Sequence, residues 1–80
     1  MKVTLKKFLD IVNKDFIETW LCEIYVDKYD EDFEQYFPIQ EVDCVKNLNQ
    51  LEPYMDYEIY GFDQKTEYGE VVRQTIWLRK

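Results

Sequence analysis

The chain lacks three common residue types, because histidine, serine and alanine do not occur in its 80 residues. Without histidine, every catalytic dyad or triad that uses an imidazole is excluded, and without serine the serine nucleophiles are excluded too. The two glycines, Gly61 and Gly69, are isolated, so no glycine-rich phosphate-binding loop is present. These absences favour a protein that is not an enzyme.

Long apolar runs are also missing, since no stretch approaches the length of a membrane span. The basic start, with Lys2, Lys6 and Lys7, is not followed by an uninterrupted apolar segment, because Asp10 and Lys14 intrude. The sequence therefore predicts neither a signal peptide nor a membrane anchor. We expect a cytoplasmic location.

Cysteine occurs twice, at Cys22 and Cys44. One disulfide is possible by count, but a cytoplasmic chain favours two free, buried thiols. Cys22 falls on the apolar side of a predicted strand, which indicates a core residue, whereas Cys44 falls at the start of a predicted helix, which favours a more reactive thiol. Two cysteines without histidine do not make a structural zinc site, and we expect no metal or other cofactor.

The chain is rich in hydrophobic and aromatic residues. Hydrophobic residues make up 46% and aromatic residues 18% of the sequence, which is too much for a disordered acidic tail. At this length the composition predicts one small folded domain that spans residues 1–80.

The first predicted helix covers residues 4–13. Leu5, Phe8, Leu9 and Val12 recur at helical spacing and form one apolar stripe. Thr4 is a suitable N-cap.

A second short helix is predicted over residues 44–52. Asp43 is a suitable N-cap, and Val45, Leu48 and Leu51 share one face. Pro53 is expected to end this helix, because the residue before a proline avoids the helical conformation.

Two β-hairpins are predicted around this helix. The first joins residues 16–26 and 33–42 through the polar, turn-like segment Asp27–Asp32, with a loop of about five or six residues. Pro38 marks the second of these strands as an edge or bulged strand. The second hairpin joins residues 56–62 and 70–79, with Asp63–Gly69 as its loop.

The element order is thus helix, strand, strand, helix, strand, strand (αββαββ). This order predicts an α+β fold in which a small antiparallel sheet of about four strands carries two short helices on one face.

Charge is distributed unevenly along the chain. The formal net charge is −7, but residues 15–70 hold 16 acidic residues against three lysines, a net charge of −13, and each end of the chain carries +3. An acidic protein of this kind is not expected to coat nucleic acid or to bind an anionic membrane.

Acidic residues and tyrosines alternate in two clusters. The first predicted partner-binding cluster contains Asp27, Tyr29, Asp30, Glu31, Asp32 and Glu34, and the second contains Glu52, Asp56, Glu58 and Asp63. One interpretation is a solvated surface that keeps the protein soluble. The other is a binding surface for a basic protein, because aromatic residues dominate interface hot spots and carboxylates steer a basic partner.

The spacing of the carboxylates suggests what such a partner binds. Carboxylates on one side of a strand recur every ~6.6 Å, which is about two phosphate steps along one DNA strand. An acidic strand or loop could therefore occupy a nucleic-acid site on a protein.

A calcium loop is the competing interpretation of the first cluster. Asp30, Asp32, Glu34 and Glu41 occupy positions 1, 3, 5 and 12 of an EF-hand loop. Position 6, which requires glycine, is Gln35, and the flanking segments are predicted strands rather than helices. The pattern does not predict an EF-hand.

The chain is short, acidic and rich in tyrosine, it contains the run Lys7-Phe8-Leu9-Asp10 near its start, and it favours residues with AT-rich codons. In these respects it resembles small proteins of phages and mobile elements of Firmicutes. That group includes anti-CRISPR and anti-restriction inhibitors, several of which are acidic blockers of nucleic-acid sites. The resemblance implies a non-enzymatic inhibitor that binds a basic, nucleic-acid-handling protein. The alternative is a small self-associating structural protein, such as a homodimer paired through a sheet edge, whose acidic surface only confers solubility.

Overall fold

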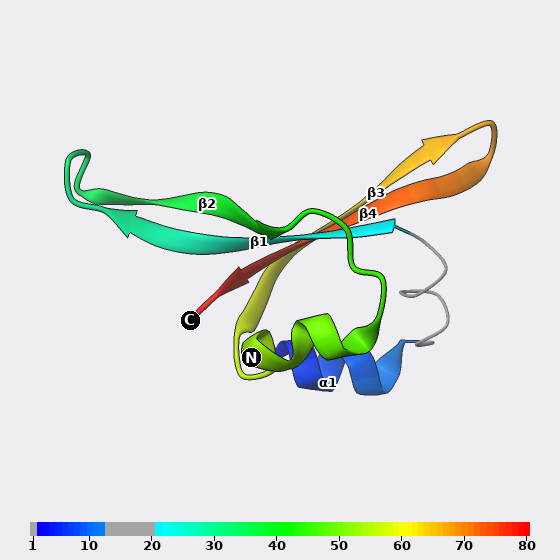
Figure 1. The fold of residues 1–80 in the computed structure, drawn as a ribbon, viewed down its shortest axis with the longest axis horizontal. Coiled ribbons are helices and arrows are strands. Elements are labelled where there is room, and N and C mark those ends of the chain that lie inside the picture. The colour runs from blue at the N-terminus through cyan, green and yellow to red at the C-terminus, as the bar shows by residue number, and fades with distance from the viewer. Residues whose placement is uncertain (1, 13–20) are drawn as a thin grey trace.

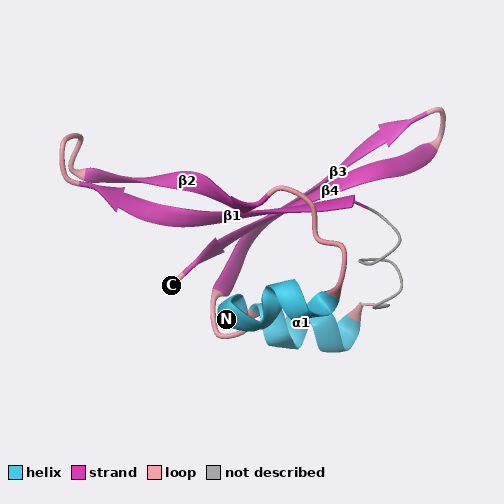
Figure 2. Ribbon diagram, in the orientation of Figure 1, coloured by secondary structure: helices cyan, strands magenta, loops and turns pink. Residues whose placement is uncertain are grey.

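The structure is a computed structural model that describes residues 2–12 and 21–80. Its elements are α1 (Leu5–Ile11), β1 (Leu21–Asp30), β2 (Gln35–Val42), the 3-10 helix η1 (Leu48–Tyr54), β3 (Glu58–Glu67) and β4 (Glu70–Arg79). The strands form one sheet, and both helices lie on the same side of it (Figures 1 and 2). The predicted α+β class is confirmed, and the predicted order of elements is matched in part, because the second helix is a 3-10 helix.

The sheet has the strand order β2-β1-β4-β3 and is mixed rather than antiparallel. Each hairpin is antiparallel as predicted, but β1 and β4 run parallel in the centre, with Ile24 opposite Ile76 and Val26 opposite Leu78. The wholly antiparallel sheet predicted from the sequence is therefore wrong at this central pair. Hairpin signals are local, whereas the direction in which two hairpins dock depends on the crossover between them.

Helix α1 begins as predicted. The Thr4 hydroxyl accepts a hydrogen bond from the Lys7 amide at 3.2 Å, and Leu5 and Leu9 are buried against the sheet. The amides of Leu5 and Lys6 donate to the carbonyls of Tyr57 and Met55, at 2.9 and 3.1 Å. These bonds fasten α1 to the segment that links η1 to β3.

The second helix differs from the prediction in type and in bounds. It is a 3-10 helix that begins after Asn47, whose side chain accepts from the Asn49 amide at 3.0 Å, and it contains Pro53. A short 3-10 helix tolerates an internal proline because only one backbone donor is lost. Asp43 is not its cap; it accepts instead from the Gln40 side chain. Of the predicted apolar face, Leu48 and Leu51 lie on η1 and contact the core, whereas Val45 is buried but precedes the helix.

Both hairpins have shorter turns than predicted, although β2 starts at Gln35 rather than at residue 33. β1 continues to Asp30, so the first loop is the four-residue turn Glu31–Glu34, and β2 is an edge strand as Pro38 indicated. Residues 16–20 of the predicted first strand lie outside the described residues.

In the second hairpin, β3 runs on to Glu67, and the turn is only Tyr68-Gly69, with φ of 53° and 80°. The loop predicted over Asp63–Gly69 is therefore mostly strand.

The core lies between the sheet and the helices. Its fully buried apolar residues come from α1, β1, η1, β4 and the segment before η1: Leu5, Leu9, Cys22, Ile24, Val26, Val45, Leu51, Ile76 and Leu78. Cys22 is a buried, free thiol as predicted, whereas Cys44 is free but partly exposed and does not start a helix. The outer parts of both hairpins extend beyond this core (Figure 1). We call residues 28–39, the outer part of the β1–β2 hairpin, the arm.

Candidate protein-binding surface

The turn at the end of the arm is organised by Asp30. Its Oδ1 atom accepts from the amides of Asp32 and Phe33, at 2.9 and 3.4 Å, which makes Asp30 a structural residue of the turn. Glu34 closes the turn with a φ of 53°, in the left-handed region. The side chains of Glu31, Asp32 and Glu34 are exposed. The structure thus brings together four carboxylates of the first predicted cluster.

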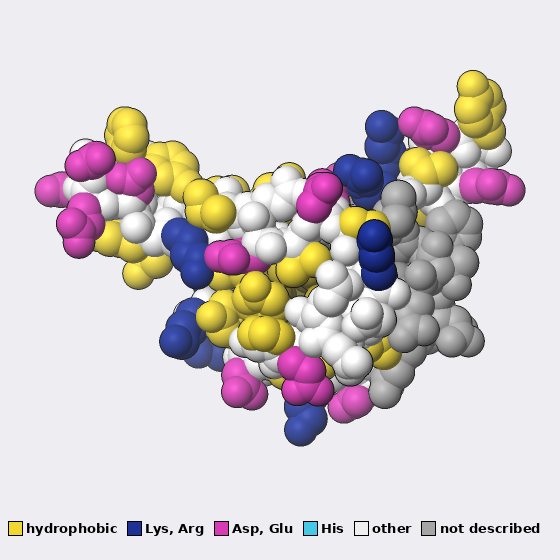
Figure 3. Space-filling model, in the orientation of Figure 1, with side chains coloured by type: hydrophobic (Ala, Val, Ile, Leu, Met, Phe, Trp, Pro, Cys, Tyr) yellow, Lys and Arg dark blue, Asp and Glu magenta, His cyan; other side chains and the backbone are white. Residues whose placement is uncertain are grey.

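Large apolar side chains are exposed on the same arm. Tyr29, Phe33 and Tyr36 have 53%, 68% and 65% of their surface in solvent. Each contacts another arm ring edge-on: Tyr29 with Tyr36 at 5.2 Å between centroids, and Phe33 with Phe37 at 5.7 Å. Hydrophobic and acidic side chains gather together over the far end of this hairpin (Figure 3). The arm is therefore both acidic and aromatic.

The end of the arm has no basic residue within its own sequence. Residues 29–36 contain four carboxylates and neither lysine nor arginine. The nearest lysine in sequence, Lys28, forms an ion pair with Glu41 at 3.0 Å, and this hydrogen-bonded carboxylate raises the pKa of Lys28. Lys28 is thus charged and already paired.

Asp27 lies apart from the other members of the first cluster. It accepts a hydrogen bond from the Tyr60 hydroxyl, and the Arg79 guanidinium lies 4.4 Å from the centre of the Tyr60 ring. Burial, the hydrogen bond to Asp27 and the charge of Asp27 together raise the pKa of Tyr60 to about 12. Asp27 therefore joins β1 to β3 rather than adding to the acidic turn.

The second predicted cluster is dispersed. Glu52 and Asp56 line a groove between α1 and η1, together with Lys6. Glu58 begins β3 opposite Arg79. Asp63 lies five residues further along β3, or about 16 Å away, so these four residues do not form one patch.

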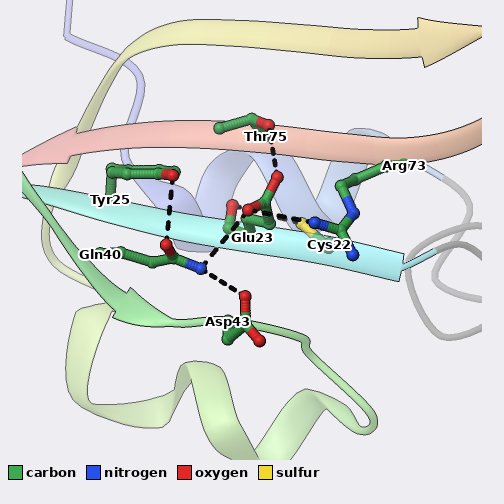
Figure 4. A network of polar contacts seen from close by, with 7 residues as sticks. All are labelled: Cys22, Glu23, Tyr25, Gln40, Asp43, Arg73 and Thr75. Carbon is green, nitrogen blue, oxygen red and sulfur yellow. Dashed lines mark hydrogen bonds and ion pairs between the residues drawn. The ribbon is translucent and has the colours of Figure 1, made fainter.

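The sheet face opposite the helices carries a polar network that the sequence pattern did not single out (Figure 4). The Glu23 carboxylate accepts from the Thr75 hydroxyl at 3.3 Å and pairs with the Arg73 guanidinium at 3.4 Å. Gln40 accepts from the Tyr25 hydroxyl at 3.2 Å and donates to Glu23 and Asp43, at 3.4 and 2.6 Å. The only sequence signal for the network is that Glu23 and Tyr25 alternate with buried residues of β1.

This network joins β1 to both neighbouring strands. Each Glu23 oxygen already has a partner in the network, so the carboxylate is engaged in holding the strands. Trp77 packs beside it, 6.1 Å from Tyr25, and lies against Gly61, where a Cβ atom would come within 3.0 Å of the indole. The residues of this network form a structural layer.

The calcium interpretation receives no support from this geometry. The segments that flank the turn are the strands β1 and β2, and Glu41 is paired with Lys28. Within residues 2–12 and 21–80, no group of three histidine, cysteine, aspartate or glutamate side chains is placed to hold a metal ion. Nor does any helix in the described part of the chain have the length and apolar character to cross a membrane.

Comparison with known proteins found no matching family model, no similar curated protein and no similar solved structure.

Proposed function

We propose that the protein is a cytoplasmic, non-enzymatic binding module that docks through its arm on a basic protein and blocks a nucleic-acid site there. One observation carries this proposal. Three aromatic side chains, Tyr29, Phe33 and Tyr36, are more than half exposed on an arm whose end holds four carboxylates and no cation.

Exposed aromatic area of this kind supports a binding role. A small domain stabilises itself by burying such rings, and rings left in solvent close together mark interaction surfaces more often than isolated ones do. Aromatic residues are enriched among interface hot spots because they contribute large contact area from few rotatable bonds. A hairpin whose turn is already closed by Asp30 would lose little further entropy on binding.

The charge of the arm indicates the chemistry of the partner. Carboxylates at Glu31, Asp32 and Glu34 would attract a basic surface over a distance set by the salt concentration and raise the rate of association. Basic surfaces of this kind are common where proteins bind phosphate backbones. The resemblance of the chain to acidic inhibitors of phages and mobile elements points to the same type of partner.

The test compares three immobilised proteins in a lysate of a Firmicutes bacterium, with bound proteins released by a salt gradient and quantified by mass spectrometry. The first is the wild type. The second carries Glu31→Lys and Asp32→Lys, which reverse the charge of the arm but leave the turn residue Asp30 intact. The third carries Glu67→Lys and Glu70→Lys, which make the same change of charge beside the turn of the other hairpin.

We expect a nucleic-acid-binding protein that the wild type and the Glu67/Glu70 variant retain and that the Glu31/Asp32 variant loses. The purified partner should then release a labelled oligonucleotide when the wild-type chain is added. Equal retention by all three proteins, or a partner that keeps its oligonucleotide, would contradict the proposal.

Self-association is the second candidate, and the topology favours it specifically because β2 and β3 are the outer strands of the sheet, with Val3 and Thr4 paired only to the start of β3. Light scattering that shows a dimer, together with a lysate experiment that retains only further copies of the chain, would support this alternative. In that case the acidic arm confers solubility.

A further inference from the structure

The two sides of the arm differ, because the strand register fixes which side chains share a face. Tyr29 is opposite Tyr36, so this pair lies on one side, whereas Lys28 is opposite Phe37 and Val26 is opposite Ile39. Val26 is buried in the core, so Phe37 and Ile39 continue the side of the sheet that the helices cover further in. Neither Phe37 nor Ile39 is among the residues packed against the core.

A pocket of about 410 Å³ lies on the arm, and its lining combines apolar, acidic and basic residues: Lys28, Tyr29, Asp30, Glu31, Asp32, Phe37 and Ile39. Phe37 and Ile39 supply an apolar wall, and Phe33 supports the Phe37 ring edge-on at 5.7 Å. Asp30, Glu31 and Asp32 supply three carboxylates at the end of the pocket nearest the turn.

The charge of this pocket selects a cation. Among the described residues, Lys28 is the only basic one in the lining, and its ammonium is already paired with Glu41 at 3.0 Å. An occupant therefore meets an excess of carboxylate beside an aromatic wall. A guanidinium fits both features, because it binds carboxylates through a planar set of donors and stacks on aromatic rings, while its stem covers apolar surface.

We infer that this pocket receives an arginine side chain of the partner, with the stem against Phe37 and Ile39 and the guanidinium at the carboxylates of Glu31 and Asp32. The inference rests on the proposed function and narrows it to one side of the arm. Tyr36, which does not line the pocket, is then peripheral to the contact.

Adjacent residues of β2 provide a matched pair of variants. Phe37→Thr removes the aromatic wall of the pocket, and Tyr36→Thr removes a ring on the opposite side. Each ring makes one edge-on contact within the arm, neither change alters the charge, and threonine is compatible with a strand. A third variant, Glu31→Gln with Asp32→Asn, removes two charges without reversing them.

The probe is a blocked hexaarginine peptide, titrated at low salt into the isotope-labelled full chain and followed by amide NMR shifts. We expect saturable shifts at residues 28–32, at Phe37 and at Ile39. Phe37→Thr should raise the Kd by about tenfold or more, whereas Tyr36→Thr should keep it within about twofold of the wild type. Hexalysine should bind more weakly than hexaarginine, because an ammonium stacks less well on a ring.

The following results would overturn the inference. If Phe37→Thr and Tyr36→Thr weaken binding equally, or if the largest shifts centre on Tyr36, the pocket is not the site. The proposed function still stands in that case if the Glu31/Asp32 charge reversal loses its lysate partner. Equal affinity for hexalysine contradicts the choice of arginine. Both proposals fail under two joint results. The Glu31→Gln, Asp32→Asn variant would bind the peptide like the wild type, and the Glu31→Lys, Asp32→Lys variant would retain every lysate partner.

Discussion

At the scale of single residues, Cys22 shows how burial alone changes the chemistry of a side chain. The thiol is fully buried in the core, and this burial, with smaller contributions from Glu23 and Cys44, raises its pKa from 9.0 to about 12. A thiol that remains protonated at neutral pH is a poor nucleophile. Cys22 therefore acts as an apolar core residue.

This raised pKa predicts a loss of stability in alkali. The unfolded chain releases the Cys22 proton near its ordinary pKa of 9.0, while the folded chain retains it until about 12, so folding becomes less favourable as the pH rises between these values. The limiting slope is about 1.4 kcal/mol per pH unit. Urea unfolding of the wild type and of Cys22→Val at about pH 8 and about pH 10 measures the difference.

We expect the wild type to lose more free energy of unfolding over this range than Cys22→Val does, because the other titrating groups are common to both proteins. A parallel decline of the two proteins would show that the thiol does not titrate differently on folding. Cys44→Ser, a change at a partly exposed position, serves as the control.

At the scale of elements, the turn of the second hairpin contains a residue that does not suit its backbone. Tyr68 and Gly69 both have positive φ, at 53° and 80°, which is the geometry of a type I′ turn. Such turns favour asparagine followed by glycine, whereas the left-handed conformation is sterically unfavourable for tyrosine. The Tyr68 side chain is fully exposed.

We therefore expect Tyr68→Asn to stabilise the protein by about 1 kcal/mol, which corresponds to a rise in Tm of roughly 4–8 °C for a domain of this size. A thermal melt followed by circular dichroism measures this rise, with Tyr68→Phe as a control that keeps the steric penalty. An unchanged Tm for Tyr68→Asn would indicate that the left-handed conformation carries no strain.

The element scale also shows where sequence patterns succeed and fail. The apolar spacing of Leu5 and Leu9 located α1, and Pro38 located an edge strand, because both signals are local. The limits of the strands were missed because residues 63–67 are polar on both sides, so they show no alternation, and Tyr68 gives no turn signal. The central parallel pair was missed because strand direction there depends on long-range docking.

The candidate site was predictable in composition but not in arrangement. The sequence placed Asp30, Glu31, Asp32 and Glu34 together because they are neighbours in the chain. It could not show that Asp30 is used by the turn or that Tyr60, from another hairpin, binds Asp27. It also gave no reason to separate Phe37 from Tyr36, because the two sides of the arm are defined only by the register of β1 against β2.

At the scale of the whole molecule, the two hairpins extend from one core but differ in character. The end of the arm presents several exposed rings and four carboxylates without a basic residue of its own. The outer part of the β3–β4 hairpin exposes the Tyr68 ring at its turn but carries charges of both signs, including the pair Lys65–Glu67 at 3.4 Å. That contrast makes Glu67 and Glu70 suitable control positions for changes in the arm.

The parallel pairing of β1 with β4 also determines how the chain must fold. Each hairpin pairs residues that are close in sequence, and isolated hairpins form in about 1–10 μs. The central contact joins residues such as Glu23 and Thr75, which are 52 positions apart, so loop closure must precede any gain in contacts. We expect this β1–β4 contact to form in the rate-limiting step of folding.

Ile76→Val, a substitution in the β1–β4 contact, should lower the free energy of unfolding by about 0.5–1.5 kcal/mol. Most of this loss should then appear as slower refolding in stopped-flow experiments. A loss that appears only as faster unfolding would contradict this order of events. If the order holds, the arm acquires its turn and its register before the domain becomes cooperative, and the proposed binding element is the part of the protein that depends least on the rest of the fold.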